Sequence, residues 1–121
     1  MIDTLNIIAA LLTIGFGAFG FLAPRFTMGA LDLEDGGSHM GLSEIRASVG
    51  CLFVAIGLFC LILGAPEAYV MMGVAYSGAA LGRATSLFLD SPPLRKAFLY
   101  FAIEAALAVW LIAANLPASS W

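Results

Sequence analysis

Charged residues are scarce in this chain, making up 11% of its 121 residues. Soluble globular domains carry about 25% charged residues, and a fold this small would expose most of its surface to water. Hydrophobic residues make up 62% of the chain, and its mean hydropathy is +1.02. Because there are too few charges to cover a water-exposed surface, the composition excludes an ordinary soluble domain and predicts that lipid surrounds the protein.

Residues that commonly bind cofactors or nucleic acid are also few. Five Lys and Arg against eight Asp and Glu give a net charge of −3, which excludes the basic surface that nucleic acid requires. Cys51 and Cys60 lie within one apolar run without a zinc or redox spacing, and the single histidine, His39, lies in a polar stretch. No metal site and no cofactor is therefore expected. The absence of a phosphate-binding loop or a Ser-His-Asp set predicts a protein that is not an enzyme.

Four long apolar runs dominate the sequence, at residues 4–23, 42–63, 68–89 and 94–116. Each run is close to the roughly 20 residues that cross a hydrocarbon layer of about 30 Å. Short turns at Gly64–Glu67 and Asp90–Pro93 separate the second, third and fourth runs. The pattern predicts an all-α fold, an integral membrane antiparallel four-helix bundle in which residues 1–121 form a single transmembrane domain.

Basic residues in the short loops predict the orientation of the four spans. Arg25 follows the first run, and Arg95 and Lys96 begin the fourth, whereas the opposite side carries Asp3 and Glu67 and no basic residue. By the positive-inside rule, the loops after the first and third runs are cytoplasmic. We therefore expect a multi-pass protein of the bacterial inner membrane, with both termini on the periplasmic side.

Four charged residues interrupt the apolar runs: Glu44, Arg46, Arg83 and Glu104. Ionisable side chains are costly in hydrocarbon, so they face the protein interior and pair with one another. Arg83 lies six residues before Leu89, and Glu104 lies eleven residues after Pro93, about 9 and 16 Å from the same membrane edge. Because side chains tilt toward the N-terminus of their helix, Arg83 and Glu104 converge, and we expect them to form an ion pair.

Glu44 and Arg46 lie near the start of the second run. We expect Arg46 to face the bundle interior or to extend to the membrane interface, and Glu44 to meet Arg83 or the basic residues at 95 and 96. Two interpretations of the cluster stay open. It fixes the helices in register, or else Glu104 binds a proton or cation and Arg83 an anionic ligand or lipid head group. The balance of two charges of each sign favours the structural interpretation.

Small residues recur at the spacing of a helix–helix contact in the first three runs. In the first run this face also holds Asn6, Ala10 and Thr13; in the second run it also holds Arg46. We take these faces as the inside of the bundle or as a protein contact. The glycines of this predicted packing seam are Gly17, Gly20, Gly50, Gly57, Gly64, Gly78 and Gly82.

Three segments resemble a bacterial membrane family catalogued as domain of unknown function 4345. They are the stretch GLSEIRASVG at residues 41–50, the stretch LGRA at residues 81–84, and Glu104. The resemblance covers nearly the whole chain and implies a common four-span scaffold with this glutamate–arginine cluster, but it implies no activity. The chain departs from the family pattern at Ser43 and at Ser48-Val49, where Asn and an aromatic–glycine pair are expected.

Small loops, the lack of a catalytic set and the small-residue faces together favour a non-catalytic membrane protein. The leading hypothesis is an accessory or structural subunit that packs against a larger inner-membrane complex, such as a respiratory or photosynthetic one. Its partners would then be the lipid bilayer and other integral membrane subunits. The main alternative is a small transporter, or a ligand-binding or proton-binding protein, that uses the charge cluster. A membrane enzyme acting on lipid or quinone is a third hypothesis.

Overall fold

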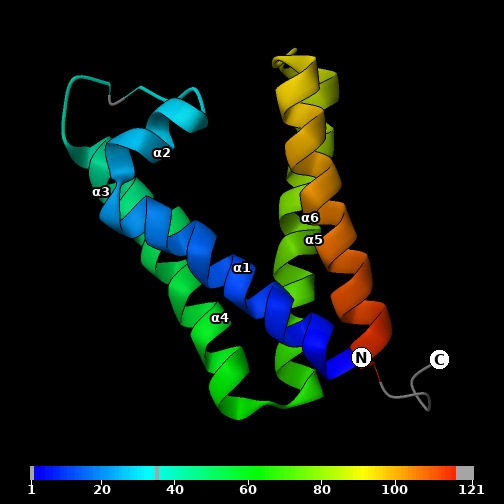
Figure 1. Ribbon diagram of the computed structural model, residues 1–121. Helices are drawn as coiled ribbons and strands as arrows, with labels where there is room; N and C mark the ends of the chain where they lie inside the picture. Colours follow the sequence, from blue (N-terminus) through cyan, green and yellow to red (C-terminus); the bar gives the residue numbers. More distant parts are fainter. Residues whose placement is uncertain (1, 35, 117–121) are drawn as a thin grey trace. The chain divides into compact units, whose positions relative to one another are not determined.

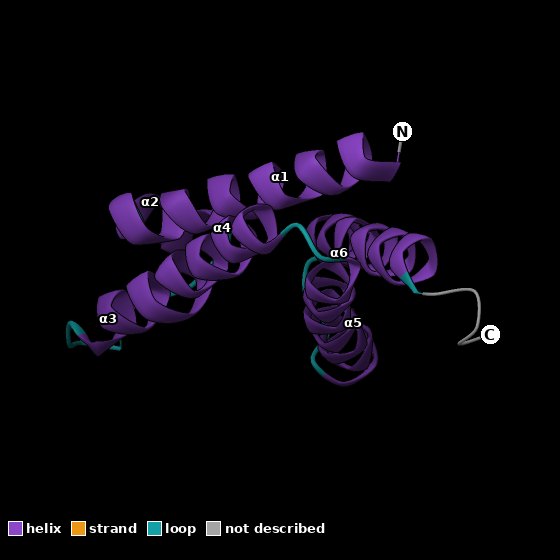
Figure 2. Ribbon diagram, turned by 90° about the horizontal axis from the view of Figure 1, so that it is seen from below, coloured by secondary structure: helices purple, strands orange, loops and turns teal. Residues whose placement is uncertain are grey.

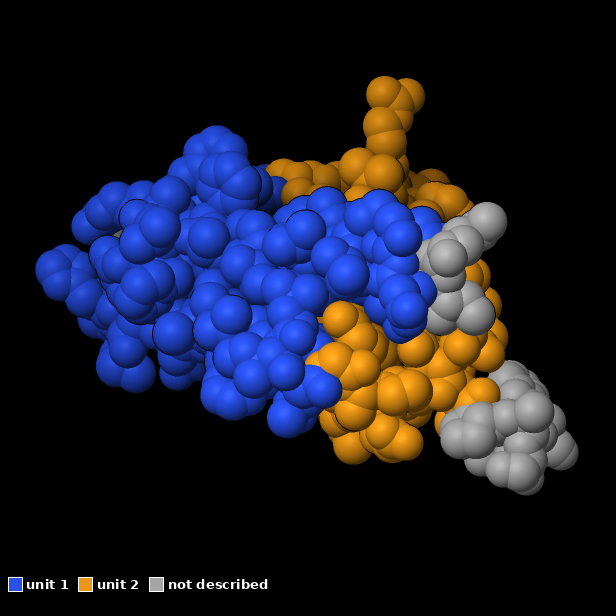
Figure 3. All heavy atoms as spheres, turned by 60° about the horizontal axis from the view of Figure 1, so that its bottom comes forward, with its two compact units in different colours: residues 1, 3–63 blue, residues 2, 64–121 orange. Residues whose placement is uncertain are grey.

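The computed structural model describes residues 2–34 and 36–116, and the regular elements within these residues are all helices (Figures 1 and 2). The all-α prediction is therefore confirmed for the described residues. The chain divides into two compact units, residues 3–63 with α1 to α4, and the residues from Gly64 onward with α5 and α6 (Figure 3). The single four-helix domain remains a prediction.

Two long helical stretches form the first unit. The first is α1 (Ile2–Leu22), and the second is continuous from Met40 to Leu63 and comprises α3 (Met40–Arg46), η1 (Ala47–Cys51) and α4 (Leu52–Leu63). Within this unit α1 crosses the second stretch, and a short helix, α2 (Pro24–Ala30), packs against α3 (Figure 1). The elements η1 and α2 differ from the prediction, because η1 is a π-helical turn and α2 lies in a segment expected to be a loop.

The second unit is a hairpin of two helices, α5 (Pro66–Leu89) and α6 (Leu94–Asn115). Pro66 occupies the first turn of α5, where its missing N–H costs nothing because that group has no intrahelical partner. The bounds lie within two residues of the predicted runs at 68–89 and 94–116. Met72 of α5 and Leu111 of α6 are the largest side chains that are fully buried in this unit.

Three helical stretches are long and apolar enough to cross a membrane, which indicates a membrane-embedded protein. Asp3–Leu22 and Leu94–Asn115 each reach a mean hydropathy of 2.1, and Met40–Leu63 reaches 2.3. Large apolar side chains are exposed along all three, including Phe19, Phe59 and Val109. In water such surfaces would aggregate. Helix α5 has 24 residues but is not among these three, so the expectation of four spans is not confirmed.

Candidate functional site

The ion pair expected between Arg83 and Glu104 is present in the hairpin of α5 and α6. Arg83 donates from Nε to Oε1 of Glu104 at 3.1 Å and from Nη2 to Oε2 at 3.0 Å. This two-point contact matches the planar guanidinium to the planar carboxylate and is stronger than a single charge contact. The Glu104 side chain is 15% exposed and that of Arg83 is 33% exposed, so the pair lies at the edge of the helix contact.

A tyrosine completes the site. The Arg83 guanidinium carbon lies 5.4 Å from the centre of the Tyr100 ring, within the range of a cation–π interaction. Tyr100 precedes Glu104 by one turn of α6, so both side chains lie on the same helix face. Tyr100 is not among the residues predicted for the site, although its i, i+4 spacing from Glu104 is a signal that could have identified it.

Contacts further along the hairpin fix the register of the two helices. A methyl group at Gly73 of α5 would lie 2.9 Å from Leu111 Cβ and 2.9 Å from Ile112 Cγ1, so α6 lies directly against this glycine. Gly73 pairs with Leu111 and Arg83 with Glu104, which is the order of an antiparallel pair. Both carboxylate oxygens of Glu104 accept hydrogen bonds from the guanidinium, and the opposite charges of the two side chains cancel.

Glu44 and Arg46 lie in the first unit, and their predicted association with Arg83 remains a prediction. Arg46 donates from Nη1 to the backbone carbonyl oxygen of Phe21 at 2.5 Å. This carbonyl lies in the last turn of α1, where free carbonyl groups and the negative end of the helix dipole attract cations. The Ser48 hydroxyl donates to the backbone carbonyl oxygen of Glu44 at 2.8 Å and lies 3.3 Å from Oε2 of the Glu44 carboxylate. Arg46 therefore ties α3 to the end of α1.

Replacing Arg46 with Gln should weaken the first unit by about 1 kcal/mol, because a charge-assisted hydrogen bond to the Phe21 carbonyl is lost from an exposed position. The measurement is the free energy of unfolding in detergent micelles. Arg25→Gln is the matched control, since Arg25 is also exposed and follows the same helix end. Equal losses in the two variants would contradict the assignment of Arg46 as a cap of α1.

Four of the predicted seam glycines lie where the two long stretches of the first unit cross. A methyl group at Gly17 would lie 2.6 Å from the Gly50 carbonyl oxygen, and one at Gly20 would lie 2.9 Å from Gly50 Cα. One at Gly57 would lie 2.7 Å from the Ala10 carbonyl oxygen. Backbone is therefore in contact with backbone, and only glycine allows this separation.

The other three seam glycines have different surroundings. Gly64 follows α4 with a φ of +63°, the left-handed conformation that commonly ends a helix, and so serves the turn. Gly78 and Gly82 lie on the exposed face of α5, away from α6, and none of the described atoms comes within 4 Å of a methyl group placed at either. Their packing role remains a prediction.

A π-helical turn lies at the closest part of the glycine contact. Element η1 spans Ala47–Cys51 and contains Gly50, whose neighbours across the contact are Gly17 and Gly20. A π turn widens the helix by one residue and is often found at functional positions. The amino-acid sequence gives no sign of this turn, because helix propensity does not distinguish one wide turn within an α-helix.

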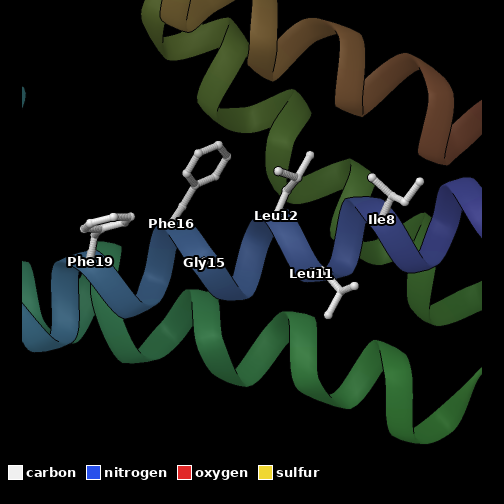
Figure 4. A pocket seen from close by; sticks show the side chains of 6 residues that line it. All are labelled: Ile8, Leu11, Leu12, Gly15, Phe16 and Phe19. Carbon is white, nitrogen blue, oxygen red and sulfur yellow. The ribbon is translucent and has the colours of Figure 1, made fainter.

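An open groove of about 330 Å³ runs along one side of α1 (Figure 4). Its lining is apolar, which suits an acyl chain, and it offers no polar side chain that would orient a ligand. The lining residues are Ile8, Leu11, Leu12, Gly15, Phe16 and Phe19. Within the described residues, moreover, no three His, Cys, Asp or Glu side chains are placed to hold a metal ion. The Arg83–Tyr100–Glu104 site thus remains the candidate with polar chemistry.

Comparison with known proteins identifies the family. The family model described as "Domain of unknown function (DUF4345)" matches residues 2–115. This match covers nearly all of the chain, so the chain belongs to this family, and the resemblance seen in the sequence is confirmed. No match was found among curated proteins or among solved structures.

Proposed function

We propose that this member of the family spans the bacterial inner membrane four times as an antiparallel four-helix bundle. In this proposal it is a small non-catalytic accessory subunit that packs against a larger membrane complex, of the respiratory or photosynthetic type. This function requires that α5 lies within the membrane and that the face exposed by α5 binds other membrane helices.

The pairing of α5 with α6 supports α5 as the fourth span. Helix α6 is apolar enough to cross a membrane, and α5 contacts it both at Gly73 and at Arg83, ten residues apart. At 1.5 Å per residue the 24 residues of α5 extend about 36 Å, enough for the hydrocarbon layer. Because α5 pairs with α6 over this length, α5 lies at the same depth in the membrane as α6. Its lower hydropathy then means that protein, rather than lipid, covers part of it.

The orientation follows from the basic residues of the loops. Arg25 and Arg95 are exposed next to the ends of the apolar stretches, as cytoplasmic loop residues are. We therefore place the α2–α3 loop and the α5–α6 turn on the cytoplasmic side. The α4–α5 turn and both termini are then periplasmic.

Cysteine labelling tests this topology. In a chain whose two native cysteines are replaced by Ala, single cysteines at Gly37, Glu67, Ala75 and Ser91 are treated with a membrane-impermeant maleimide. In intact inside-out vesicles, cysteines at Gly37 and Ser91 should react, and the one at Glu67 should react only after the vesicles are opened. A cysteine at Ala75 should be labelled at least tenfold more slowly than the cysteines in the loops, in intact and in opened vesicles. Rapid labelling at Ala75 in intact membranes would contradict the membrane position of α5.

The exposed small-residue face of α5 is the observation that carries the accessory role. Ala75, Gly78, Gly82 and Thr85 lie along this face and are all exposed. The spacing of Gly78 and Gly82 is the small-xxx-small pattern that allows two membrane helices to approach closely. Small residues give no packing advantage against acyl chains, whereas they allow the backbone of another helix to come close. This face therefore favours contact with another helix.

Site-specific photo-crosslinking in the native membrane tests the association. A photoreactive residue at Gly78 or Gly82 should crosslink to a distinct membrane protein, which mass spectrometry identifies and which co-purifies with the chain in mild detergent. The same probe at Leu81 or Val109, which are 71% and 68% exposed, should crosslink to lipid. Purification of the chain alone, with lipid adducts at all four positions, would contradict an accessory role.

A second candidate function is ligand binding at the charge cluster, as in a small transporter or a proton-binding protein. The exposure of Arg83 favours a ligand that approaches the guanidinium. Proton binding by Glu104 is less favoured, because both of its oxygens already accept hydrogen bonds from Arg83.

A further inference from the structure

The guanidinium of Arg83 has an edge that Glu104 does not cover. Arginine carries five N–H donors, and Glu104 accepts from Nε and from Nη2. Neither N–H of Nη1, nor the second N–H of Nη2, has an acceptor among the residues that the structure describes. One third of the side chain remains exposed, so these donors can be reached from outside the hairpin.

The depth of the pair decides what can reach these donors. Arg83 lies six residues before the end of α5 at Leu89, about 9 Å along the helix. Its side chain is held by Glu104, which prevents it from extending to the lipid head groups as an unpaired arginine would. If α5 spans the membrane, the free N–H groups face hydrocarbon, where an unmade hydrogen bond is costly. An acceptor must therefore come to Arg83 at that depth.

The charge of the pair decides the chemistry of this acceptor. Arg83 and Glu104 cancel, so an anion bound to the free edge would leave a net negative charge in a low dielectric. A cation would be repelled, because the free edge of the guanidinium presents only N–H donors. An uncharged oxygen with lone pairs, as in a carbonyl group, satisfies the donors without adding charge.

Arg83 is preceded by two glycines on α5 and is approached by Tyr100 on α6. Gly82 adjoins Arg83 in the chain and Gly78 lies one turn earlier, and no described atom comes within 4 Å of a methyl group placed at either glycine. On α6, Tyr100 lies against the guanidinium. Neither glycine therefore places a side chain over the open edge of Arg83.

We propose that Arg83, held by Glu104 and Tyr100, binds the carbonyl oxygen of an uncharged, membrane-soluble ligand at hydrocarbon depth. This site goes beyond the accessory role. It rests on the proposed function only in that α5 must lie within the membrane.

Quenching of tryptophan fluorescence tests the site in the full chain. The chain has two tryptophans, so Trp121→Phe leaves Trp110 as the fluorophore, six residues after Glu104 on α6 and about 9 Å from it along the axis. The protein in lipid nanodiscs is titrated with a decyl-substituted benzoquinone, which carries carbonyl acceptors and quenches tryptophan. We expect a saturable phase at one quinone per protein. Decylbenzene, which has no acceptor, and decanoate, which is charged, should not displace the quinone.

Substitutions test whether the saturable quenching depends on the Arg83 guanidinium. The double variant Arg83→Gln/Glu104→Gln keeps an uncharged, hydrogen-bonding pair and so avoids a lone buried charge, and it should bind the quinone at least tenfold more weakly. Arg25→Gln removes an exposed guanidinium outside the charge cluster and should leave the saturable phase unchanged. Circular dichroism of each variant checks that its helix content equals that of the parent chain.

Three outcomes would overturn the proposal: quenching that rises linearly without saturation, equal binding by the double variant, or displacement by decanoate. Because the test uses the isolated protein, it does not depend on any partner subunit. Failure of the accessory role would appear in the crosslinking experiment, and failure of the four-span topology in the labelling of Ala75. Each result is therefore distinguishable from failure of the carbonyl site.

Discussion

Replacement of Arg83 by Leu should destabilise the protein by about 3–5 kcal/mol and sharply reduce the amount of folded protein in the membrane. The change leaves the Glu104 carboxylate, which is 15% exposed, without the two N–H donors that now hold it. Removing one partner of a largely buried ion pair is strongly destabilising because the other charge remains in a low dielectric. Unfolding by denaturant in detergent micelles, followed by circular dichroism, measures the loss.

The double variant Arg83→Leu/Glu104→Leu distinguishes the cost of an unpaired charge from the cost of losing the shapes of the two side chains. With both charges removed no group is left unpaired, and apolar replacements of such pairs are often neutral or stabilising. We expect the double variant to recover most of the stability lost in the single variant. If both variants lose the same free energy, the helix contact depends on the shape of Arg83 rather than on its charge.

The sequence was sufficient to predict this pair, and the reason is geometric. A helix advances by a fixed distance per residue, and a turn of only four residues, at 90–93, sets the ends of α5 and α6 side by side. The heights of Arg83 and Glu104 follow by counting from that turn. The tilt of side chains toward the helix N-terminus brings the two together. Rigid elements joined by a short turn leave little freedom for another outcome.

The face that α5 turns toward α6 could not be predicted in the same way. The small-residue pattern predicts that Ala75, Gly78 and Gly82 lie inside the bundle or at a protein contact, and this remains a prediction. The contact with α6 is made by the face with Gly73 and Arg83. That face also carries large buried side chains, Tyr69, Met72 and Tyr76, and the facing helix α6 buries the small residues Ala97 and Ala108. Close packing needs small residues on only one of two partners. A single helix sequence does not reveal which partner supplies them.

Two local features of the first unit also could not be predicted from the sequence. The segment 24–30 holds Pro, Thr and two small residues, which are typical of a loop, yet it forms α2 because it packs against α3. The π-helical turn at Ala47–Cys51 lies where Gly50 packs against Gly17 and Gly20 of α1. Both features lie at tertiary contacts, and such contacts can outweigh local propensity.

That contact between glycines leads to the second large effect, which we expect from Gly20→Leu. A side chain at Gly20 would begin 2.8 Å from the Val49 carbonyl carbon and 2.9 Å from Gly50 Cα. These are backbone atoms inside a helix and cannot turn aside as a flexible side chain can. The two long stretches of the first unit must then separate, and we expect a loss of about 3 kcal/mol, at the upper end of the cost of overpacking.

Gly15→Leu is the matched control on the same helix. No described atom lies within 4 Å of a methyl group placed at Gly15, so the same substitution meets open space and adds an apolar side chain to a surface that already exposes Leu11 and Phe19. We expect the free energy of unfolding of this variant to lie within about 0.5 kcal/mol of that of the parent chain, as is usual for surface substitutions. Both replacements remove a helical glycine, so propensity contributes equally to the two. A difference between them measures the close approach of α1 to η1, and equal stability would show that α1 does not pack there.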